Sequence, residues 1–532
     1  VDELVGDIQG WQVLTAAAVV LVLVAPLLFM VTPVWAAGAQ NSPGSVVQWD
    51  DSLQWMNDET PHPGQLEGAT NPMEFYGTYE RPEDGDFDYP EGAYGVQSWW
   101  DYGHWITTRA ERIPNANPFQ QNAAEAANFL LAPSEEDAED VLASQSDEGE
   151  NTRYVMVDWQ MVDANSKFGA PVTFYNDEGQ ELTTDDFYSL LYQQGEQSFQ
   201  PVTTVKDQRY YESLMVHLYE FHGSATSAQP VVVDWQETQA QTASGEQVTV
   251  NTMPQGEQPT VRTFDNMSAA RAYVEEDGSA QVGGIGGFPS EDLAALEHYR
   301  LVHANQQPAI QRSLRRQQVA QALGIPGSAL RTTPQRWVKT FERVPGATVE
   351  GSGADPGEEV VATVEMGMPG SNETFTYTQR ATANEDGEFA FTLPYSTTGY
   401  AEYGPENGYT NTSVRAEGAY RIFDEGETLD NGTTVQNRAE VDVSEAKVVG
   451  DDGEPVTVTL EENRTEPEGA GDDADGNASD DGSTNESALR GAAVEESLAP
   501  ASGPVDGDAA VGGASVTAIE AAPHRSALAA AP

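Results

Sequence analysis

One stretch of this chain carries no charged residue, and it constrains the fold more than any other feature. WQVLTAAAVVLVLVAPLLFMVTPVW runs from Trp11 to Trp35. At about 1.5 Å per residue, a helix of this length would be about 37 Å long, which is enough to cross a bilayer with some tilt. Its two terminal tryptophans match the aromatic residues that gather at membrane interfaces. The sequence predicts a flank over residues 1–10 and a transmembrane helix over residues 11–35.

A secretory signal is the alternative interpretation of this segment. AAGA follows Trp35 and resembles a small-residue cleavage site. However, the flank carries Asp2, Glu3 and Asp7 instead of basic residues, and the apolar run is longer than a signal requires. These features favour the transmembrane helix.

The charge balance excludes one class of partner. Lys and Arg total 25 against 86 Asp and Glu, which gives a net charge of -61. Nucleic-acid binding needs clustered basic residues, so no nucleic-acid partner is expected. The acidic excess fits the surface of a protein from a salt-loving organism, because concentrated salt screens the repulsion. An acidic secreted protein from an ordinary source is the alternative. The chain has no cysteine, which excludes disulfides and cysteine-based zinc sites.

Residues 36–310 alternate between helical and strand patterns. Helices are predicted in SVVQWDDSLQWMND, NAAEAANFLLA, SEEDAEDVLASQ (with Ser134 as N-cap) and DQRYYESLMVHLYEF. Strands are predicted in AYGVQSWW, RYVMVDW and PVVVDW, and SEDLAALEHYRLVHA reads as a helix running into a strand. Such alternation predicts a mixed α/β globular core.

The pattern changes twice more toward the C-terminus. Residues 311–336 form a basic linker, and basic residues continue to Arg343. This basic segment, Arg312–Arg343, either contacts anionic lipid or a phosphate-bearing ligand, or is an exposed helix that pairs with nearby acids; the second is favoured. Short strands separated by Gly and Pro predict a β-sandwich-like domain over residues 337–447. Residues 448–532 are rich in Asp, Glu, Gly and Ala, which predicts a disordered acidic tail.

The most unusual chemistry lies in SWWDYGHW. Trp99 and Trp100 provide flat apolar walls and two indole N–H donors, and Asp101 provides an acceptor. Together they could hold a substrate hydroxyl, while Tyr102 and Gly103 shape the turn. Such a pocket rejects an analogue that lacks the hydroxyl, because buried polar groups then stay unpaired. A buried aromatic cluster capped by Asp101 is the structural alternative, and physics alone favours it.

WWDYG, residues 99–103, resembles the signature of the oligosaccharyltransferase catalytic subunit family, called STT3 in eukaryotes and AglB in archaea. The resemblance implies that Trp99, Trp100 and Asp101 bind the hydroxyl of the Ser or Thr in an N-x-S/T acceptor. It also implies a last transmembrane helix followed by a globular domain outside the membrane. The chain is therefore expected to be a C-terminal portion of an archaeal member of this family.

A second segment, DWQMVDANSKFGA, resembles the archaeal variant of the family's DK motif and supplies Asp158, Met161 and Lys167. The resemblance implies a second wall for the acceptor's Ser or Thr, with Met161 touching a threonine methyl. Asp163 offers an alternative alignment to Lys167. The simpler interpretation of Asp158 and Lys167 is a solvated ion pair at a strand end.

The family transfers a glycan from a dolichol-phosphate carrier to the Asn amide, with Mg or Mn expected for the full-length enzyme. Its catalytic acids and metal ligands lie in a multi-helix membrane region that this sequence does not contain, so no catalytic residue or metal ligand is expected here. Asp84, Asp86 and Asp88 are interpreted as an acidic solvated loop.

The expected partners are an acceptor polypeptide with N-x-S/T, a lipid-linked oligosaccharide through the missing region, and the membrane. The expected location is the cell membrane, with the globular domains on the extracellular side. A non-enzymatic, membrane-anchored cell-surface or adhesion protein of a halophile is the second functional hypothesis. WWDYG together with the DxxM…K stretch discriminates against it.

Overall fold

The computed structural model describes residues 46–62, 93–145, 152–176, 179, 181–195, 198–241, 245, 247–256, 258–326, 330, 335–368, 373–429 and 433–465. The predicted helix over 11–35, the stretch with Asp84, Asp86 and Asp88, and the tail beyond residue 465 lie outside these ranges. Within the described part, no helix is both long and apolar enough to span a bilayer. The chain divides into two compact units, residues 1–51 and 52–532, and helix α2 (Val46–Glu59) begins in the first and ends in the second.

A five-stranded sheet with the order β11-β12-β3-β1-β2 supports the predicted site. Its strands are β1 (Gly95–Gln97), β2 (Ile113–Pro114), β3 (Thr152–Asp158), β11 (Tyr299–Ala304) and β12 (Val338–Arg343). β1 runs parallel to β2 and β3, whereas β12 pairs antiparallel with β3 and β11. Every residue of β3 except Arg153 is buried, which is the pattern of a strand covered on both faces.

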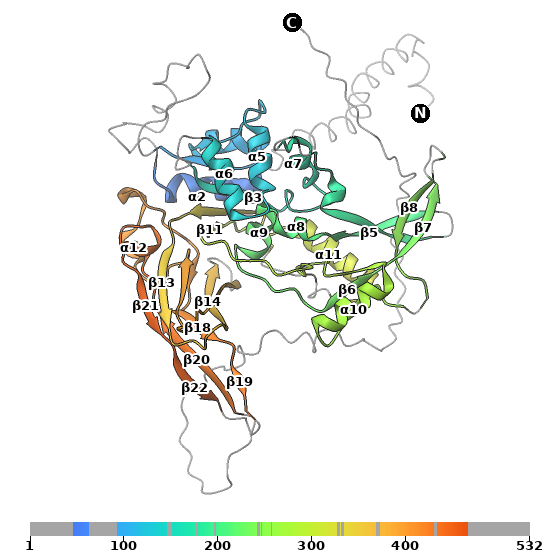
Figure 1. Ribbon diagram of the computed structural model, residues 1–532. Helices are drawn as coiled ribbons and strands as arrows, with labels where there is room; N and C mark the ends of the chain where they lie inside the picture. The colour runs from blue at the N-terminus through green and yellow to red at the C-terminus, as the bar shows by residue number, and fades with distance from the viewer. Residues whose placement is uncertain are drawn as a thin grey trace, which may run out of the picture. The chain divides into compact units, whose positions relative to one another are not determined.

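Short helices pack around this sheet (Figure 1). They are α5 (Ala123–Leu130), α6 (Glu135–Gln145), α7 (Gly169–Phe174), α8 (Gln208–Glu212) and α9 (Leu214–Phe221). α9 contacts β3, and α5 contacts α6, α7 and α9. Ser134 caps α6 as predicted, because its Oγ accepts a hydrogen bond from the backbone N–H of Asp137 at 3.1 Å.

Two of the predicted helices differ from the structure. DQRYYESLMVHLYEF forms α8 and α9 instead of one helix, because Ser213 between them has a ψ of 128°. SEDLAALEHYRLVHA contains strand β11, but the residues before it are not helical. Leu293 makes a bridge with Thr226 there, and the backbone N–H of Leu296 donates to the carbonyl of Gly223 at 2.8 Å. Tertiary hydrogen bonds thus replace helical ones in that segment.

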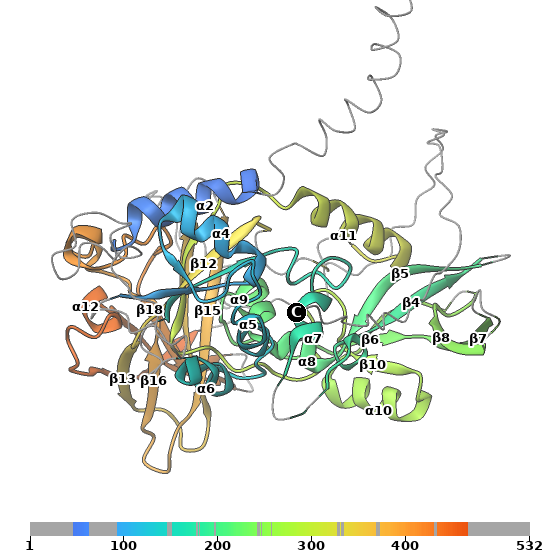
Figure 2. The ribbon, with the colours of Figure 1, turned by 90° about the horizontal axis from the view of Figure 1, so that it is seen from above.

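Two smaller sheets follow the core helices in the chain. The first has the order β5-β4-β8-β7 and the second β10-β6-β9. Their strands are β4 (Tyr188–Gln194), β5 (Phe199–Lys206), β6 (Val231–Asp234), β7 (Gln236–Gln241), β8 (Gln247–Thr252), β9 (Val261–Thr263) and β10 (Ala280–Val282). α10 (Met267–Asp277) packs on β6 and β10, and α11 (Ile310–Leu323) lies beside β5 (Figure 2).

Residues from Ala347 onward form two further sheets with alternating burial. The three-stranded sheet contains β13 (Ala347–Ser352), β16 (Phe389–Leu393) and β21 (Val456–Thr459). The seven-stranded sheet contains β14 (Glu359–Met368), β15 (Glu373–Thr382), β17 (Arg415–Ala416), β18 (Tyr420–Asp424), β19 (Glu427–Thr428), β20 (Thr434–Val441) and β22 (Glu461–Thr465). Other short elements are α12 (Glu445–Val448) and the 3₁₀ turns Thr184–Asp186, Tyr400–Glu402 and Pro405–Asn407. A mixed α/β fold with many strands is therefore confirmed.

The structure shifts both predicted ends of the β-rich region. β12 lies inside the predicted 337–447 domain but pairs with β3 and β11 of the core sheet. β21 and β22 lie inside the segment predicted to be disordered from residue 448, yet they pair with β13 and β20. Pairing with strands that are distant in the chain orders these segments. The local sequence of a strand does not predict which sheet the strand will join.

Candidate functional site

WWDYG follows β1 and turns at once into a compact helical segment. Trp99 is extended, with φ -64° and ψ 140°, and a 3₁₀ turn then covers Trp100–Tyr102. The chain continues as one helical turn, α4 (Gly103–Trp105), and a π-helical turn over Ile106–Ala110. This places the motif at the end of a strand, where a sheet commonly presents functional side chains.

Position 103 has no room for a side chain, so it requires glycine. Its φ of -54° is ordinary helical backbone. A Cβ at this position would lie 2.2 Å from the carbonyl oxygen of Ala116, which is far inside van der Waals contact. The close approach holds the WWDYG turn against the loop after β2.

The two tryptophans differ in exposure. Trp99 is buried, and Trp100 is partly buried. Their ring centroids are 5.8 Å apart. The ring of Phe174 of α7 contacts both tryptophans, with centroid distances of 5.5 Å to Trp99 and 6.1 Å to Trp100. Trp99 therefore belongs to the core, as the structural alternative expected, whereas Trp100 keeps part of its surface exposed. Phe174 was missed by the sequence reasoning, because nothing in its local sequence marks it.

Lys167 connects the two predicted motifs. Its Nζ donates to Asp101 Oδ2 at 2.7 Å and to the Tyr102 hydroxyl at 3.0 Å. The Tyr102 hydroxyl donates in turn to Asp158 Oδ2 at 2.9 Å. Four of the predicted residues thus form one hydrogen-bonded chain. The structure brings WWDYG and the second motif together.

Tyr102 keeps its proton in this chain of hydrogen bonds. Burial raises the pKa of Tyr102 well above its usual value, and the nearby carboxylates of Asp158 and Asp101 raise it further. The neutral phenol can then accept from Lys167 and donate to Asp158 at the same time.

The loop after β3 is held by Asp158. Asp158 is fully buried, and its Oδ1 accepts a hydrogen bond from the backbone N–H of Met161 at 3.1 Å. Met161 is only 1% exposed, so its side chain lies inside the protein. Lys167 closes the loop by donating its backbone N–H to the carbonyl of Gln160 at 2.9 Å. Asp158 is therefore not a solvated residue at a strand end.

Asp163, the alternative residue for the second motif, faces a different group. Its Oδ1 accepts a hydrogen bond from Arg315 of α11 at 3.2 Å, and its Oδ2 lies 4.0 Å from Arg312 Nε. Lys167 pairs with Asp101 instead. The two acids of the loop thus serve two separate clusters.

Two polar atoms of the motif have unused hydrogen-bonding capacity. Trp100 Nε1 and Asp101 Oδ1 are buried and have no hydrogen-bond partner in the described part of the chain. One is a donor and the other an acceptor. A hydroxyl group offers the matching pair, a proton to give and a lone pair to share. The two residues thus carry the donor and the acceptor that a hydroxyl group would need.

Arg112 anchors the end of the helical segment. Its guanidinium is fully buried and donates to the carbonyls of Met56, Asn57 and Thr60 at 3.0, 3.1 and 2.9 Å. It also donates to the Tyr94 hydroxyl at 2.8 Å. An arginine in this position satisfies carbonyls at the C-terminal end of α2. It ties that helix end to the segment that carries the motif, a role that sequence reasoning missed.

One acidic cluster in the described residues could hold a cation. The carboxylates of Asp355, Glu358 and Asp424 have oxygens within 4.8 Å of one another. Hard cations such as Mg²⁺ or Ca²⁺ prefer such oxygen ligands. Asp355 and Glu358 lie in the turn before β14, Asp424 ends β18, and the cluster contains none of the predicted site residues.

Comparison with known proteins places these features in a family. Residues 46–162 match the AglB core domain, and residues 346–456 match the archaeal glycosylation protein B long peripheral domain. The dolichyl-monophosphooligosaccharide–protein glycotransferase AglB of Haloferax volcanii is 49% identical in a match of 484 residues that covers 88% of this chain and 45% of that protein. Dolichyl-phosphooligosaccharide-protein glycotransferase 3 of Archaeoglobus fulgidus is 28% identical over 68% of this chain and 39% of that protein.

The chain thus spans less than half the length of these curated relatives. Among solved structures, the apo crystal structure of the Archaeoglobus fulgidus oligosaccharyltransferase matches 86% of this chain and 47% of that chain, with 21% sequence identity and a TM-score of 0.51. This likeness concerns the fold. The 49% identity with the Haloferax volcanii protein and the two matched AglB domains show that the chain belongs to the AglB family.

Proposed function

We propose that this chain is the acceptor-reading part of an enzyme that transfers a lipid-linked oligosaccharide to the Asn of an N-x-S/T sequence. The observation that carries the proposal is that two neighbouring residues of the motif each have one unpartnered polar atom, Trp100 Nε1 and Asp101 Oδ1. The hydroxyl of the acceptor Ser or Thr donates to Asp101 and accepts from Trp100. The names of the curated relatives, which are dolichyl-linked oligosaccharide–protein glycotransferases, support this activity over the cell-surface hypothesis.

Lys167 prepares Asp101 for this role. The ammonium holds Oδ2 at 2.7 Å, which fixes the carboxylate plane and leaves Oδ1 for the ligand. A hydroxyl that fills the site satisfies two buried groups, whereas a methyl in its place leaves both unpaired. A site of this kind can discriminate by about 10⁴-fold or more. We propose Trp99, Tyr102 and Gly103 as supports that hold Trp100 and Asp101 in place.

The second wall of the site comes from the loop after β3. We propose that Lys167 forms its surface and that the buried Asp158 and Met161 hold it from inside. This places Met161 beneath the wall instead of in direct contact with a threonine methyl.

A metal ion does not fit next to Asp101, because Lys167 already places a positive charge 2.7 Å from its Oδ2. The Mg or Mn of the reaction, which would stabilise the negative charge of the leaving phosphate, is proposed to bind acids outside this chain. We also propose that the folded part lies outside the cell membrane, where it meets acceptor polypeptides.

The test removes the proposed acceptor and the proposed donor in separate variants. In the full-length enzyme that contains this chain, Asp101→Ala should abolish transfer to N-x-T peptides, because the hydroxyl loses its acceptor. In this chain alone, Trp100→Phe removes the N–H donor and should weaken binding of an N-x-T peptide about tenfold, the effect of one buried hydrogen bond. Isothermal titration calorimetry measures the second effect.

An N-x-V peptide serves as the control ligand, since it has the shape of N-x-T without the hydroxyl. Trp100→Phe should not weaken its already poor binding further. Trp55→Phe, which changes a tryptophan stacked on His303, should alter neither peptide's affinity. Full transfer by Asp101→Ala, or equal losses for both peptides in Trp100→Phe, would overturn the proposal.

A further inference from the structure

A cleft lies next to the loop that carries Lys167. Residues 163–165 of this loop line it together with β5, α8, α11 and the segment around Ile285. Its volume is about 70 Å³, which holds a few water molecules or one small polyatomic ion.

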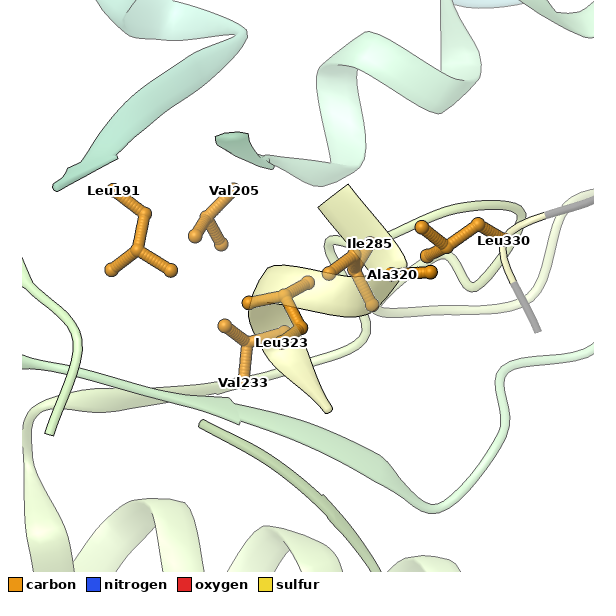
Figure 3. Packing of buried hydrophobic residues seen from close by; sticks show 7 residues of the cluster. All are labelled: Leu191, Val205, Val233, Ile285, Ala320, Leu323 and Leu330. Atoms are coloured by element: carbon orange, nitrogen blue, oxygen red, sulfur yellow. The ribbon is translucent and has the colours of Figure 1, made fainter. Parts of the chain in front are cut away.

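Hydrophobic packing fixes α11 against this cleft. Ala320 and Leu323 of α11 are buried in a cluster with Val205, Val233 and Ile285 (Figure 3). This anchor sets the rotation of the helix. Its basic residues, which precede the anchor in the chain, therefore line the cleft in a fixed arrangement.

The cleft has more positive than negative charges. Lys206, Arg312, Arg315 and Arg316 line it, and Asp163 is the acid among its lining residues. Glu220 of α9 lies next to them and accepts hydrogen bonds from Arg312 and Arg316. When Lys206 is protonated, two of the four positive charges remain after both acids are counted, in a chain whose net charge is -61.

The cleft also has unused donors. Arg312 Nη1 and Arg316 Nη1 are buried and have no hydrogen-bond partner among the described residues. The Arg312 side chain is 3% exposed, so water does not satisfy it easily. Such a group costs free energy when it stays unpaired. Two unpaired guanidinium donors in one small cleft indicate an anionic ligand.

Lys206 adds an ammonium to the same place. Its Nζ lies 4.4 Å from the centre of the Tyr210 ring. Burial lowers the pKa of Lys206 to about 7; the charge of Glu220 opposes this shift, and those of Arg312 and Arg316 add to it. Asp163 on the loop also favours the charged form. An anion among these groups would stabilise the protonated lysine.

We propose that this cleft binds a phosphate group, held by the free N–H groups of Arg312 and Arg316 and by the ammonium of Lys206. Guanidinium groups match the geometry of phosphate oxygens, and a dianion compensates the two excess charges. The group is either free inorganic phosphate or the phosphate of a lipid. This site is separate from the acceptor site and does not depend on it.

Titration of the full chain with inorganic phosphate tests the proposal. Calorimetry in a constant concentration of potassium chloride keeps the competing anion fixed. We expect one phosphate per chain, with Lys206→Met and Arg316→Gln each weakening the affinity about tenfold or more, the loss of one charge-assisted hydrogen bond. Arg380→Gln removes an arginine paired with Glu359 on the β-rich sheet and should bind like the unchanged chain.

Asp163→Asn keeps the proposal testable if those variants fold poorly. It removes a negative charge from the cleft, so phosphate affinity should rise several-fold, which a misfolded protein cannot produce. Vesicles with phosphatidic acid, compared with phosphatidylcholine alone, distinguish the two sources. The ligand is a lipid phosphate if the chain binds vesicles with phosphatidic acid but not free phosphate, and if Lys206→Met and Arg316→Gln weaken that vesicle binding. Binding of neither probe, or equal binding by Lys206→Met and the unchanged chain, overturns the proposal.

Discussion

At the scale of single residues, Gly103 lies where the neighbouring backbone leaves no room for a side chain. Gly103→Ala would place a Cβ 2.2 Å from the Ala116 carbonyl oxygen. Relief of this clash must move the backbone of the WWDYG turn, so we expect the free energy of unfolding to fall by about 1–3 kcal/mol. Urea unfolding followed by tryptophan fluorescence measures the change. Gly418→Ala is the matched control, because a Cβ there meets no atom within 4 Å. Equal stability of the two variants would contradict the crowding at Gly103.

His217 gives the protein a dependence on acid. Burial lowers the pKa of His217 from 6.5 to about 4, and the hydrogen bond from Nε2 to the Ser224 carbonyl opposes this shift. The folded pKa lies below the unfolded one, so the unfolded chain binds the proton first as the pH falls. The free energy of unfolding should therefore fall between pH 6.5 and about 4, with His217 contributing about 3 kcal/mol.

Urea unfolding at several pH values in this window measures the effect. Carboxylates also titrate there, so the comparison is with His217→Gln, which keeps a side-chain N–H donor but cannot be protonated. The variant should lose less stability on acidification. If the free energy of unfolding depends on pH in the same way for both proteins, His217 does not contribute to the loss of stability in acid.

At the scale of secondary-structure elements, Arg112 joins two elements that are separate in the chain. Arg112→Met would leave the carbonyls of Met56, Asn57 and Thr60 without this donor. We expect the free energy of unfolding to fall by about 3 kcal/mol or more. Arg109→Met changes an exposed arginine of the same helical segment and should cost much less. Differential scanning calorimetry compares the stability of the two variants. A similar small loss of stability in both would contradict the anchoring role of Arg112.

Some elements could be predicted because their signal is local. β3 is an apolar, β-branched run with both faces buried, and α6 begins at a serine that caps it. The non-helical segment before β11 had no such signal. Glu135 accepts hydrogen bonds there from the backbone N–H groups of Glu297 and His298, at 2.7 and 2.8 Å. A carboxylate from a distant helix overrides the apolar spacing, and no window of sequence contains both partners.

The site divides in the same way. Trp100, Asp101 and Lys167 could be selected from motifs that resemble a known family, and the structure joins them through the hydrogen bond between Lys167 and Asp101. Phe174 and Arg112 could not, because a phenylalanine and an arginine in ordinary surroundings acquire their roles only through packing. The sequence also does not show that the Met161 side chain is buried. The expectation that it touches a threonine methyl was made without this information.

At the scale of the whole molecule, charge repulsion sets the conditions for folding. A net charge of -61 opposes the compact state in dilute buffer. The Debye length falls from about 10 Å at 0.1 M salt to about 3 Å at 1 M, which screens this repulsion. The melting temperature should therefore rise steeply with potassium chloride, as scanning calorimetry would measure. Sucrose, which carries no charge, should raise it far less; an equal effect of sucrose would argue against screening as the cause.

The position of β12 in the sheet also determines when the protein can fold during synthesis. β12 lies between β3 and β11 and pairs with both, although it begins at Val338 and β1 ends at Gln97. A nascent chain that has passed the WWDYG segment must wait for β12 before β3 gains its second neighbour. Until then, one edge of β3 exposes unpaired backbone groups to other chains. Such late, long-range pairing is slow, so the growing chain has an interval in which chaperones or early translocation would protect it from aggregation.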